Sequence, residues 1–377
     1  MKMLQPQELK QDFHLVEATY LLNHSVGRPL KSTQEALQQS FFAPWQESGR
    51  EPWGAWLGII DDFRNALARL FNGRRDDFCP QVNLSSALTK LVMSLERLQG
   101  EHCVVLMSEI DFPSMGFALK KALAAGCELR FIPKALDITD VNVWDAHLSA
   151  DVDLVFISHA YSNTGQQAPL AEIVPLAKSR GCLTLIDVAQ SAGIVPLDLA
   201  ALAPDFMIGS SVKWLCSGPG AAYLWVNPGR LDECRPRDVG WFSHENPFEF
   251  DIHGFRYHPS ALRFWGGTPS ILPYAIAANA IGYFAELGSL SLRAHNQALI
   301  DLVAAELDEE FVSPRESARR SGTLILDLGE RQDKLLQALQ QANISVDARS
   351  QGIRVSPHIY NDEADMRALL RVIAACR

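Results

Sequence analysis

The sequence lacks the long apolar segments that mark membrane or exported proteins. No stretch approaches the roughly 18 uninterrupted apolar residues of a membrane-spanning helix. Residues 1–11 contain no apolar core of the length found in signal peptides. We therefore expect a cytoplasmic protein with no membrane partner.

The sequence also has fewer basic than acidic residues. The chain has 34 Lys and Arg against 44 Asp and Glu, a formal net charge of −10. Nucleic-acid binding needs a basic surface to meet the phosphates, so we expect no nucleic-acid partner. One small basic pocket for a phosphorylated cofactor remains compatible with this balance.

Cysteine and metal-binding patterns are sparse. The seven cysteines are odd in number, widely spaced and without a CxxC pair. They are Cys79, Cys103, Cys127, Cys182, Cys216, Cys234 and Cys376. This distribution predicts a reducing compartment with neither a zinc site nor a disulfide framework. The spacings of His159, His244, His253 and His258 match no metal motif, so we expect no metal.

What the chain does contain is a regular alternation of strand and helix patterns. Helices are predicted at 55–71, 86–98, 115–125 and 170–179. The predicted strands are Cys103–Met107, Glu128–Ile132, Asp153–Ser158, Cys182–Asp187, Phe206–Gly209 and Ala221–Val226. Strands that are apolar on both faces and alternate with helices indicate an α/β fold with a mostly parallel sheet. Ligands of such sheets bind beyond the carboxyl ends of the strands.

The length of 377 residues suits a large domain with a smaller companion. Residues 235–273 are rich in Pro, Gly and aromatics, and a loop region of this length is more often functional than idle. Beyond it, helical patterns flank short strands, which is typical of an α+β domain. We predict an N-terminal arm at 1–14, a large domain at 15–265 and a small C-terminal domain at 266–377.

Three features fall at the ends of predicted strands. Asp187 ends one strand, Lys213 follows another, and a Gly-Pro-Gly turn occupies 218–220. A lysine here would be partly desolvated, which lowers its pKa and frees the amine for Schiff-base chemistry. Taken singly the features are weak, since a strand-end aspartate is a helix cap or surface turn about half the time. Together, with the acid 26 residues before the lysine, they are much more specific.

With these residues in place, the sequence resembles the class V aminotransferase family of pyridoxal 5′-phosphate (PLP) enzymes, and within it the kynureninases. The likeness covers nearly the whole chain. The matching stretches are Phe112-Pro113-Ser114, Thr164-Gly165-Gln166, 187–193, 213–220, Gly240-Trp241-Phe242 with His244, and Arg354-Val355-Ser356 with Tyr360-Asn361. The resemblance implies the PLP-dependent transferase fold of the aspartate-aminotransferase type. That fold has a mostly parallel seven-stranded sheet in the large domain and a smaller α+β C-terminal domain.

The resemblance also implies a catalytic set. Lys213 would hold PLP as a Schiff base and shuttle protons at the substrate Cα. Asp187 would pair with the pyridine nitrogen and keep it protonated, which makes the ring an electron sink. Gln190 would donate a hydrogen bond to the ring hydroxyl oxygen. Arg354 would bind the α-carboxylate of a small amino-acid substrate as a bidentate clamp, its alternative being a surface arginine.

The remaining cofactor contacts are implied in the same way. Phe112 would stack on the ring, although it could equally be a core aromatic. Ser85 and Ser86 would hold the phosphate at a helix start, or simply cap that helix. The others are Asn163 near the ring hydroxyl, and Ser210, Trp241 and Thr268 at the phosphate. Thr268 would come from a second subunit, so we expect a homodimer with sites at the subunit interface.

Some positions depart from the pattern of the familiar reactions. Kynureninases have histidine at the position of Gln190, tyrosine at that of Val212 and aspartate at that of Met115. Cysteine desulfurases need a cysteine on a loop before the carboxylate-binding arginine, and residues 335–353 contain none. We therefore expect amino transfer or a related reaction through a Cα carbanion. The alternatives are kynureninase-like Cβ–Cγ hydrolysis and a non-catalytic PLP-fold protein that senses a metabolite.

Overall fold

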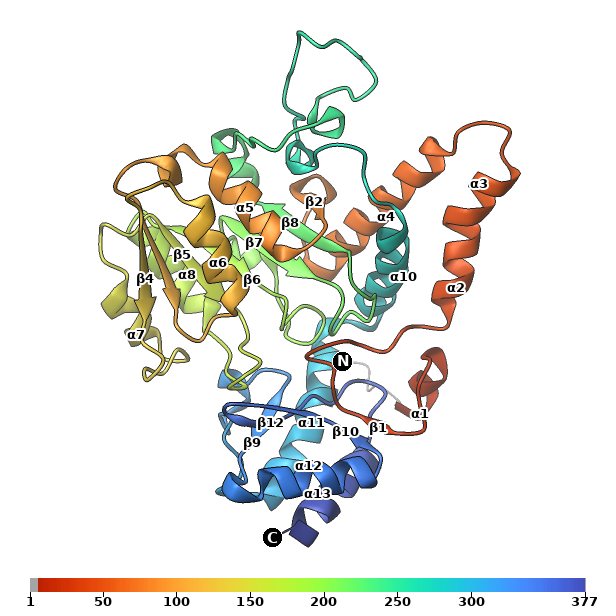
Figure 1. The fold of residues 1–377 in the computed structure, drawn as a ribbon, viewed down its shortest axis with the longest axis vertical. Coiled ribbons are helices and arrows are strands. Elements are labelled where there is room, and N and C mark those ends of the chain that lie inside the picture. Colours follow the sequence, from red (N-terminus) through yellow and green to blue (C-terminus); the bar gives the residue numbers. More distant parts are fainter. Residues whose placement is uncertain (1–5, 377) are drawn as a thin grey trace.

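The chain forms two lobes, seen one above the other in Figure 1. The computed structural model describes residues 6–376. The upper lobe is built on a seven-stranded sheet, and the lower lobe holds a three-stranded sheet with helices α11, α12 and α13. This architecture confirms the predicted PLP-transferase type of α/β fold.

The large sheet has the strand order β2-β8-β7-β6-β5-β3-β4. Its strands are β2 (Phe78–Gln81), β3 (Val104–Ser108), β4 (Glu128–Ile132), β5 (Leu154–Ser158), β6 (Leu183–Asp187), β7 (Phe206–Ser210) and β8 (Ala222–Val226). The pairs β3/β4, β3/β5, β5/β6 and β6/β7 are parallel, and β8 is antiparallel to both β2 and β7. The sheet is therefore mostly parallel, as predicted. Strand β2 escaped the sequence prediction because it is short and contains Pro80.

Helices cover both faces of this sheet. They are α4 (Trp53–Phe71), α5 (Leu84–Ser94), α6 (Pro113–Ala122), α7 (Val141–His147), α8 (Leu170–Ser179), α9 (Leu199–Leu202) and α10 (Leu272–Leu287). Successive residues of a strand point to opposite faces of the sheet, so each strand contributes side chains to two hydrophobic cores. Val155 and Ile157 of β5 pack in one core with α4, α8 and α10, whereas Leu154 and Phe156 pack in the other with α5 and α6.

Helix α5 shows how local sequence sets an element that borders the site. Asn83 precedes the helix, and its side-chain oxygen accepts a hydrogen bond from the Ser86 backbone N–H at 2.8 Å. The helix thus begins at Leu84, two residues earlier than predicted, and it ends at Ser94. Asn83, rather than either serine, is the capping residue.

The lower lobe carries the C-terminal elements and also holds the N-terminal segment. Its elements are β9 (Leu324–Leu326), β10 (Ile344–Ser345), β11 (Asp347–Arg349), β12 (Gly352–Val355), α11 (Ser289–Glu306), α12 (Gln332–Gln341) and α13 (Glu363–Cys376). Strand β1 (Thr19–Tyr20) pairs in parallel with β10. Helices α1 (Pro6–Leu9), α2 (Ser32–Leu37) and α3 (Ala43–Glu47) complete the fold, with a π-helical turn between α2 and α3. The proposed domain limits remain a prediction.

One expectation about cysteine was wrong. Cys103 and Cys127 form a disulfide with their Cα atoms 4.7 Å apart. The two residues immediately precede the parallel strands β3 and β4, and the Glu128 backbone N–H donates to the Cys103 carbonyl at 2.8 Å. A spacing of 24 residues gave no signal of this contact, because strand pairing creates it. Cytoplasmic location therefore stays a prediction, since disulfides are rare in reducing compartments.

No helix within residues 6–376 is both long and apolar enough to cross a membrane.

Candidate active site

A cavity of about 220 Å³ lies where β3, β5, β6 and β7 end. Ser158, Asp187 and Ser210, the last residues of three of these strands, line it. This is the carboxyl edge at which parallel sheets bind ligands. Seven of the predicted site residues also line this cavity: Ser85, Phe112, Asn163, Asp187, Gln190, Ser210 and Lys213.

Lys213 and Asp187 form the charged centre of the cavity. Protein surrounds the Lys213 side chain except where it borders the cavity, and this desolvation lowers the pKa of its amine. The Asp187 carboxylate opposes that shift, while Arg354 adds to it. A lowered pKa increases the neutral fraction of the amine, which is the form that attacks a carbonyl carbon.

Asp187 is buried, and only one of its two carboxylate oxygens accepts a hydrogen bond from the described residues. Its Oδ1 accepts a hydrogen bond from the Ala189 backbone N–H at 2.8 Å. Its Oδ2 has no hydrogen-bond partner among the residues that the structure describes. Burial raises the pKa of this carboxyl to about 6, against the opposing effects of the Ala189 hydrogen bond and Lys213. A cationic N–H donor in the cavity would restore its ordinary ionisation.

Gln190 connects the cavity to the N-terminal segment. Its Nε2 donates to the His24 backbone carbonyl at 3.0 Å, while its Oε1 is buried without a partner. The amide nitrogen has a second N–H, so a bond to a ring oxygen remains chemically available. That role is still a prediction.

The start of α5 supplies the features of an anion site. Ser85 lines the cavity, whereas Ser86 lines an adjoining cavity of about 790 Å³ together with Lys90, Lys121 and Arg237. Backbone N–H groups at a helix N-terminus attract anions, and nearby cations strengthen that attraction.

Phe112 is the residue immediately before helix α6, and its side chain is 64% exposed. Its ring borders the cavity rather than joining a core, which rules out the alternative of a core aromatic. An exposed ring face at this position is available for stacking on a planar ligand.

Arg354 lies on β12, in the lower lobe, and reaches towards the cavity from below. Its Nη1 is 3.4 Å from Ser162 Oγ and 3.5 Å from Asn163 Oδ1, and both of these residues line the cavity. The side chain is almost fully buried, so it is not the surface arginine of the alternative interpretation.

Trp241 and Thr268 do not line the cavity within one chain. Trp241 packs among aromatic rings, with its centroid 4.5 Å from that of Phe242 and 6.0 Å from that of Trp53. Thr268 is exposed. Contact of either residue with a bound phosphate therefore stays a prediction, which for Thr268 depends on a second subunit.

Sequence reasoning missed four polar residues at or near the site. Tyr161 lines the cavity with its hydroxyl buried and unpartnered. Asp111 is buried nearby, and burial raises the pKa of its carboxyl to about 7. His24 and Asp347 contact the arginine side of the site. An available signal for Asp347 was its place in a strand-turn-strand pattern ending at Arg354.

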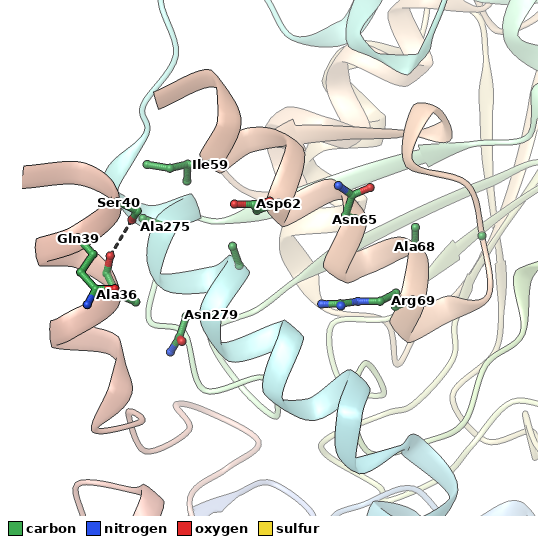
Figure 2. A pocket seen from close by; sticks show the side chains of 12 residues that line it. Ala36, Gln39, Ser40, Ile59, Asp62, Asn65, Ala68, Arg69, Ala275 and Asn279 are labelled. Atoms are coloured by element: carbon green, nitrogen blue, oxygen red, sulfur yellow. Dashed lines mark hydrogen bonds between the residues drawn. The ribbon is translucent and has the colours of Figure 1, made fainter. Parts of the chain in front are cut away.

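A wider cavity of about 950 Å³ lies away from the candidate active site, between α2, α4 and α10. Figure 2 shows Asp62, Asn65 and Arg69 projecting from one helix of this cavity, with Asn279 opposite them. None of the predicted site residues lines it.

The residues around the first cavity fit PLP. The unpaired Oδ2 of Asp187 suits a protonated pyridine nitrogen, and the amine of Lys213 suits an aldehyde. The exposed Phe112 ring suits a planar heterocycle, and the start of α5 suits a phosphate. These are four different chemical groups, and PLP carries a counterpart for each of them.

Comparison with known proteins agrees with this assignment. A sequence profile described as "Aminotransferase class-V" matches residues 55–374. An uncharacterised aminotransferase, YcbU of Bacillus subtilis, is 26% identical over 373 residues, which is 98% of each chain. A kynureninase of Pseudomonas fluorescens is 28% identical over 333 residues, covering 83% of this chain and 78% of that protein.

Solved structures share the fold. The apo cysteine desulfurase of Thermococcus onnurineus superposes with a TM-score of 0.85 at 20% identity, covering 100% of this chain and 98% of that one. A C-DES mutant with glycine covalently linked to its PLP also has a TM-score of 0.85, at 23% identity, covering 96% and 98%. The chain therefore belongs to the class V aminotransferase family, and its cofactor is pyridoxal 5′-phosphate.

Proposed function

We propose that this protein is an enzyme that transfers the amino group of a small amino acid, or carries out a closely related reaction at the substrate Cα. The observation that carries the proposal is the presence of Lys213 and Asp187 in one cavity, where burial lowers the pKa of the amine. When bound, PLP supplies an electron sink for a carbanion at Cα.

Each protein group then has a defined task. Arg354 binds the α-carboxylate through guanidinium N–H groups on the side of Ser162 and Asn163. Lys213 Nζ would remove the proton from Cα and, as the resulting ammonium, would deliver it to the carbon that carried the cofactor aldehyde, which is the transfer that converts the amino acid to a 2-oxo acid. The Asp187 carboxylate would hold a proton on the ring nitrogen of bound PLP, and Phe112 would stack on the ring.

A cysteine desulfurase reaction has less support than amino transfer, because it needs a nucleophilic cysteine at the site. The cavity lining, within the part of the chain that the structure describes, includes no cysteine. Cys216 is close to Lys213 in sequence, but it is buried, and burial raises the pKa of its thiol. Its Sγ lies 3.9 Å from the buried His358 Nε2, inside the protein, so it is not placed as an exposed nucleophile.

A second candidate is hydrolysis of a kynurenine-like substrate, which the similarity to a kynureninase favours. Met115 and Val212 argue against it, because neither side chain can form the polar contacts that aspartate and tyrosine offer. Met115 is buried and borders the cavity. A non-catalytic metabolite sensor is the remaining alternative, and it predicts cofactor binding without turnover.

One experiment separates the three. Purified holoenzyme is mixed with each of a panel of amino acids, including kynurenine, and the released cofactor is analysed after denaturation. Amino transfer predicts formation of pyridoxamine 5′-phosphate and a 2-oxo acid. Release of anthranilate and alanine from kynurenine alone would establish hydrolysis instead. No conversion of any amino acid would favour the sensor.

We further propose that the active form is a homodimer with sites at the subunit interface. Phe248, Phe250, Ile252 and Phe255 are all exposed on the loop that follows Trp241, and Figure 1 shows that loop projecting from the upper lobe. Apolar exposure of this kind marks interaction surfaces. Light scattering of the holoenzyme would give the mass of two chains, whereas the mass of one would contradict the proposal.

A further inference from the structure

We propose that Asp347 and His24 are positioning residues that hold Arg354 in the orientation needed to bind the substrate α-carboxylate. The inference rests on the proposed function, because it concerns the arginine assigned to the carboxylate there.

Asp347 accepts two hydrogen bonds from one edge of the Arg354 guanidinium. The two residues are directly opposite each other in the antiparallel pair β11–β12. Arg354 Nε donates to Asp347 Oδ1 at 2.9 Å, and Nη2 donates to Oδ2 at 2.5 Å. Two parallel hydrogen bonds to one carboxylate fix both the position and the plane of a guanidinium.

The opposite edge of the guanidinium makes two long hydrogen bonds that a ligand carboxylate can replace. Nη1 points towards Ser162 and Asn163, at 3.4 Å and 3.5 Å from their side-chain oxygens. Both residues line the cavity that contains Lys213. A substrate carboxylate therefore meets the Nη1–Nη2 edge, while Asp347 occupies the Nε edge and prevents the side chain from rotating.

His24 holds Asp347 in turn. Its Nε2 lies 2.9 Å from Asp347 Oδ1, and its Nδ1 lies 2.7 Å from Ser356 Oγ. The imidazole is fully buried, and this burial lowers its pKa against the opposing effect of Asp347. Because a carboxylate only accepts, Nε2 donates the hydrogen bond to Asp347. Arg349 Nη1, at 3.4 Å from Asp347 Oδ2, is the other cation that faces this carboxylate.

The same histidine reaches the cofactor side of the site. Its backbone carbonyl accepts the hydrogen bond from Gln190 Nε2 at 3.0 Å. The segment around His24 therefore fixes the carboxylate-binding arginine and Gln190 together. An ion pair serving only the stability of the hairpin would not require this connection.

The test uses two reagents that capture the cofactor whatever the natural substrate is. Aminooxyacetate and methoxyamine both exchange their nitrogen for that of Lys213 at the cofactor aldehyde carbon and release the free lysine amine. Only aminooxyacetate carries a carboxylate. The ratio of their second-order rate constants, followed by cofactor absorbance, therefore measures carboxylate recognition independently of turnover.

For Arg354→Gln we expect this ratio to fall by about tenfold, the usual effect of losing a charge-assisted hydrogen bond. Asp347→Asn and His24→Gln should lower it in the same direction, with a smaller effect for His24→Gln. Asp308→Asn is the matched control, because Asp308 pairs with Arg315 on the surface, at 2.9 Å, with its side chain 97% exposed. The control should leave the ratio unchanged.

The outcomes distinguish this inference from the proposed function. If Arg354→Gln lowers the ratio but Asp347→Asn and His24→Gln do not, the positioning role is wrong and the proposed function stands. If Asp347→Asn slows both reagents equally, its role is structural and the inference fails. If Arg354→Gln itself leaves the ratio unchanged, the carboxylate role in the proposed function is wrong. Should Asp347→Asn fail to fold, the His24→Gln ratio decides.

Discussion

The buried carboxyl of Asp187 makes a prediction that runs against the usual effect of altering an active site. Removing its charge should stabilise the cofactor-free protein. Burial raises the pKa of this group from 3.8 to about 6. The difference corresponds to about 3 kcal/mol of destabilisation of the charged form relative to the unfolded chain. The Asp187→Asn side chain keeps an oxygen that can accept the Ala189 N–H.

The sign of the pH dependence follows from the raised pKa. Because the folded protein holds the proton more tightly than the unfolded chain, the penalty is absent at low pH and complete above about pH 6. The stability advantage of Asp187→Asn over the wild type should therefore grow from about 1 kcal/mol at pH 4.5 to about 3 kcal/mol at pH 8.

Urea unfolding of the two cofactor-free proteins across this range provides the assay, with Asp308→Asn as the control for loss of an exposed carboxylate. Added PLP should stabilise the wild type more than Asp187→Asn, because the ring nitrogen needs the carboxylate. A constant difference between the two proteins from pH 4.5 to 8, or a less stable Asp187→Asn protein at pH 8, would show that the buried Asp187 carboxylate does not destabilise the cofactor-free fold.

Three further predictions concern the lysine, a close backbone approach and the disulfide. Lys213→Ala should reduce turnover of any amino acid by about 10²–10⁴-fold, the usual contribution of a general acid–base group, as measured by product formation in the presence of excess PLP. Gly27→Ala should destabilise the protein by about 1–3 kcal/mol. Its added carbon would overlap the Lys213 carbonyl. Gly58→Ala, with no atom within 4 Å and inside helix α4, should instead leave stability unchanged or raise it by up to about 1 kcal/mol in the same urea assay. Reduction of the Cys103–Cys127 disulfide, which closes a loop of 24 residues, should cost about 3 kcal/mol in unfolding free energy. A thiol assay on the denatured, unreduced protein should find five free cysteines, and seven would show that the bond does not form.

Most of the residues on the cofactor side of the site could be predicted from the sequence. Asp187 and Ser210 end apolar strands, and Lys213 comes soon after one, so a parallel sheet necessarily brings them to one edge. Phe112 and Gln190 required a family likeness in addition, because neither residue type reveals its role by itself. Their positions around one cavity agree with that likeness.

The arginine side of the site was harder to predict. His24 and Asp347 are 323 positions apart, and they meet only because the N-terminal segment crosses to the lower lobe, where β1 pairs with β10. Strands of two residues carry no periodicity that a sequence pattern can register. The same limit hid the Cys103–Cys127 contact, which depends on the register of β3 against β4.

The claim that PLP is held on Lys213 is open to a direct measurement. Purified holoenzyme is treated with borohydride, which makes the cofactor link permanent, and is then digested and analysed by mass spectrometry. We expect the phosphopyridoxyl group on the peptide that contains Lys213. Label on a different lysine, or no label in a sample that contains stoichiometric PLP, would contradict it.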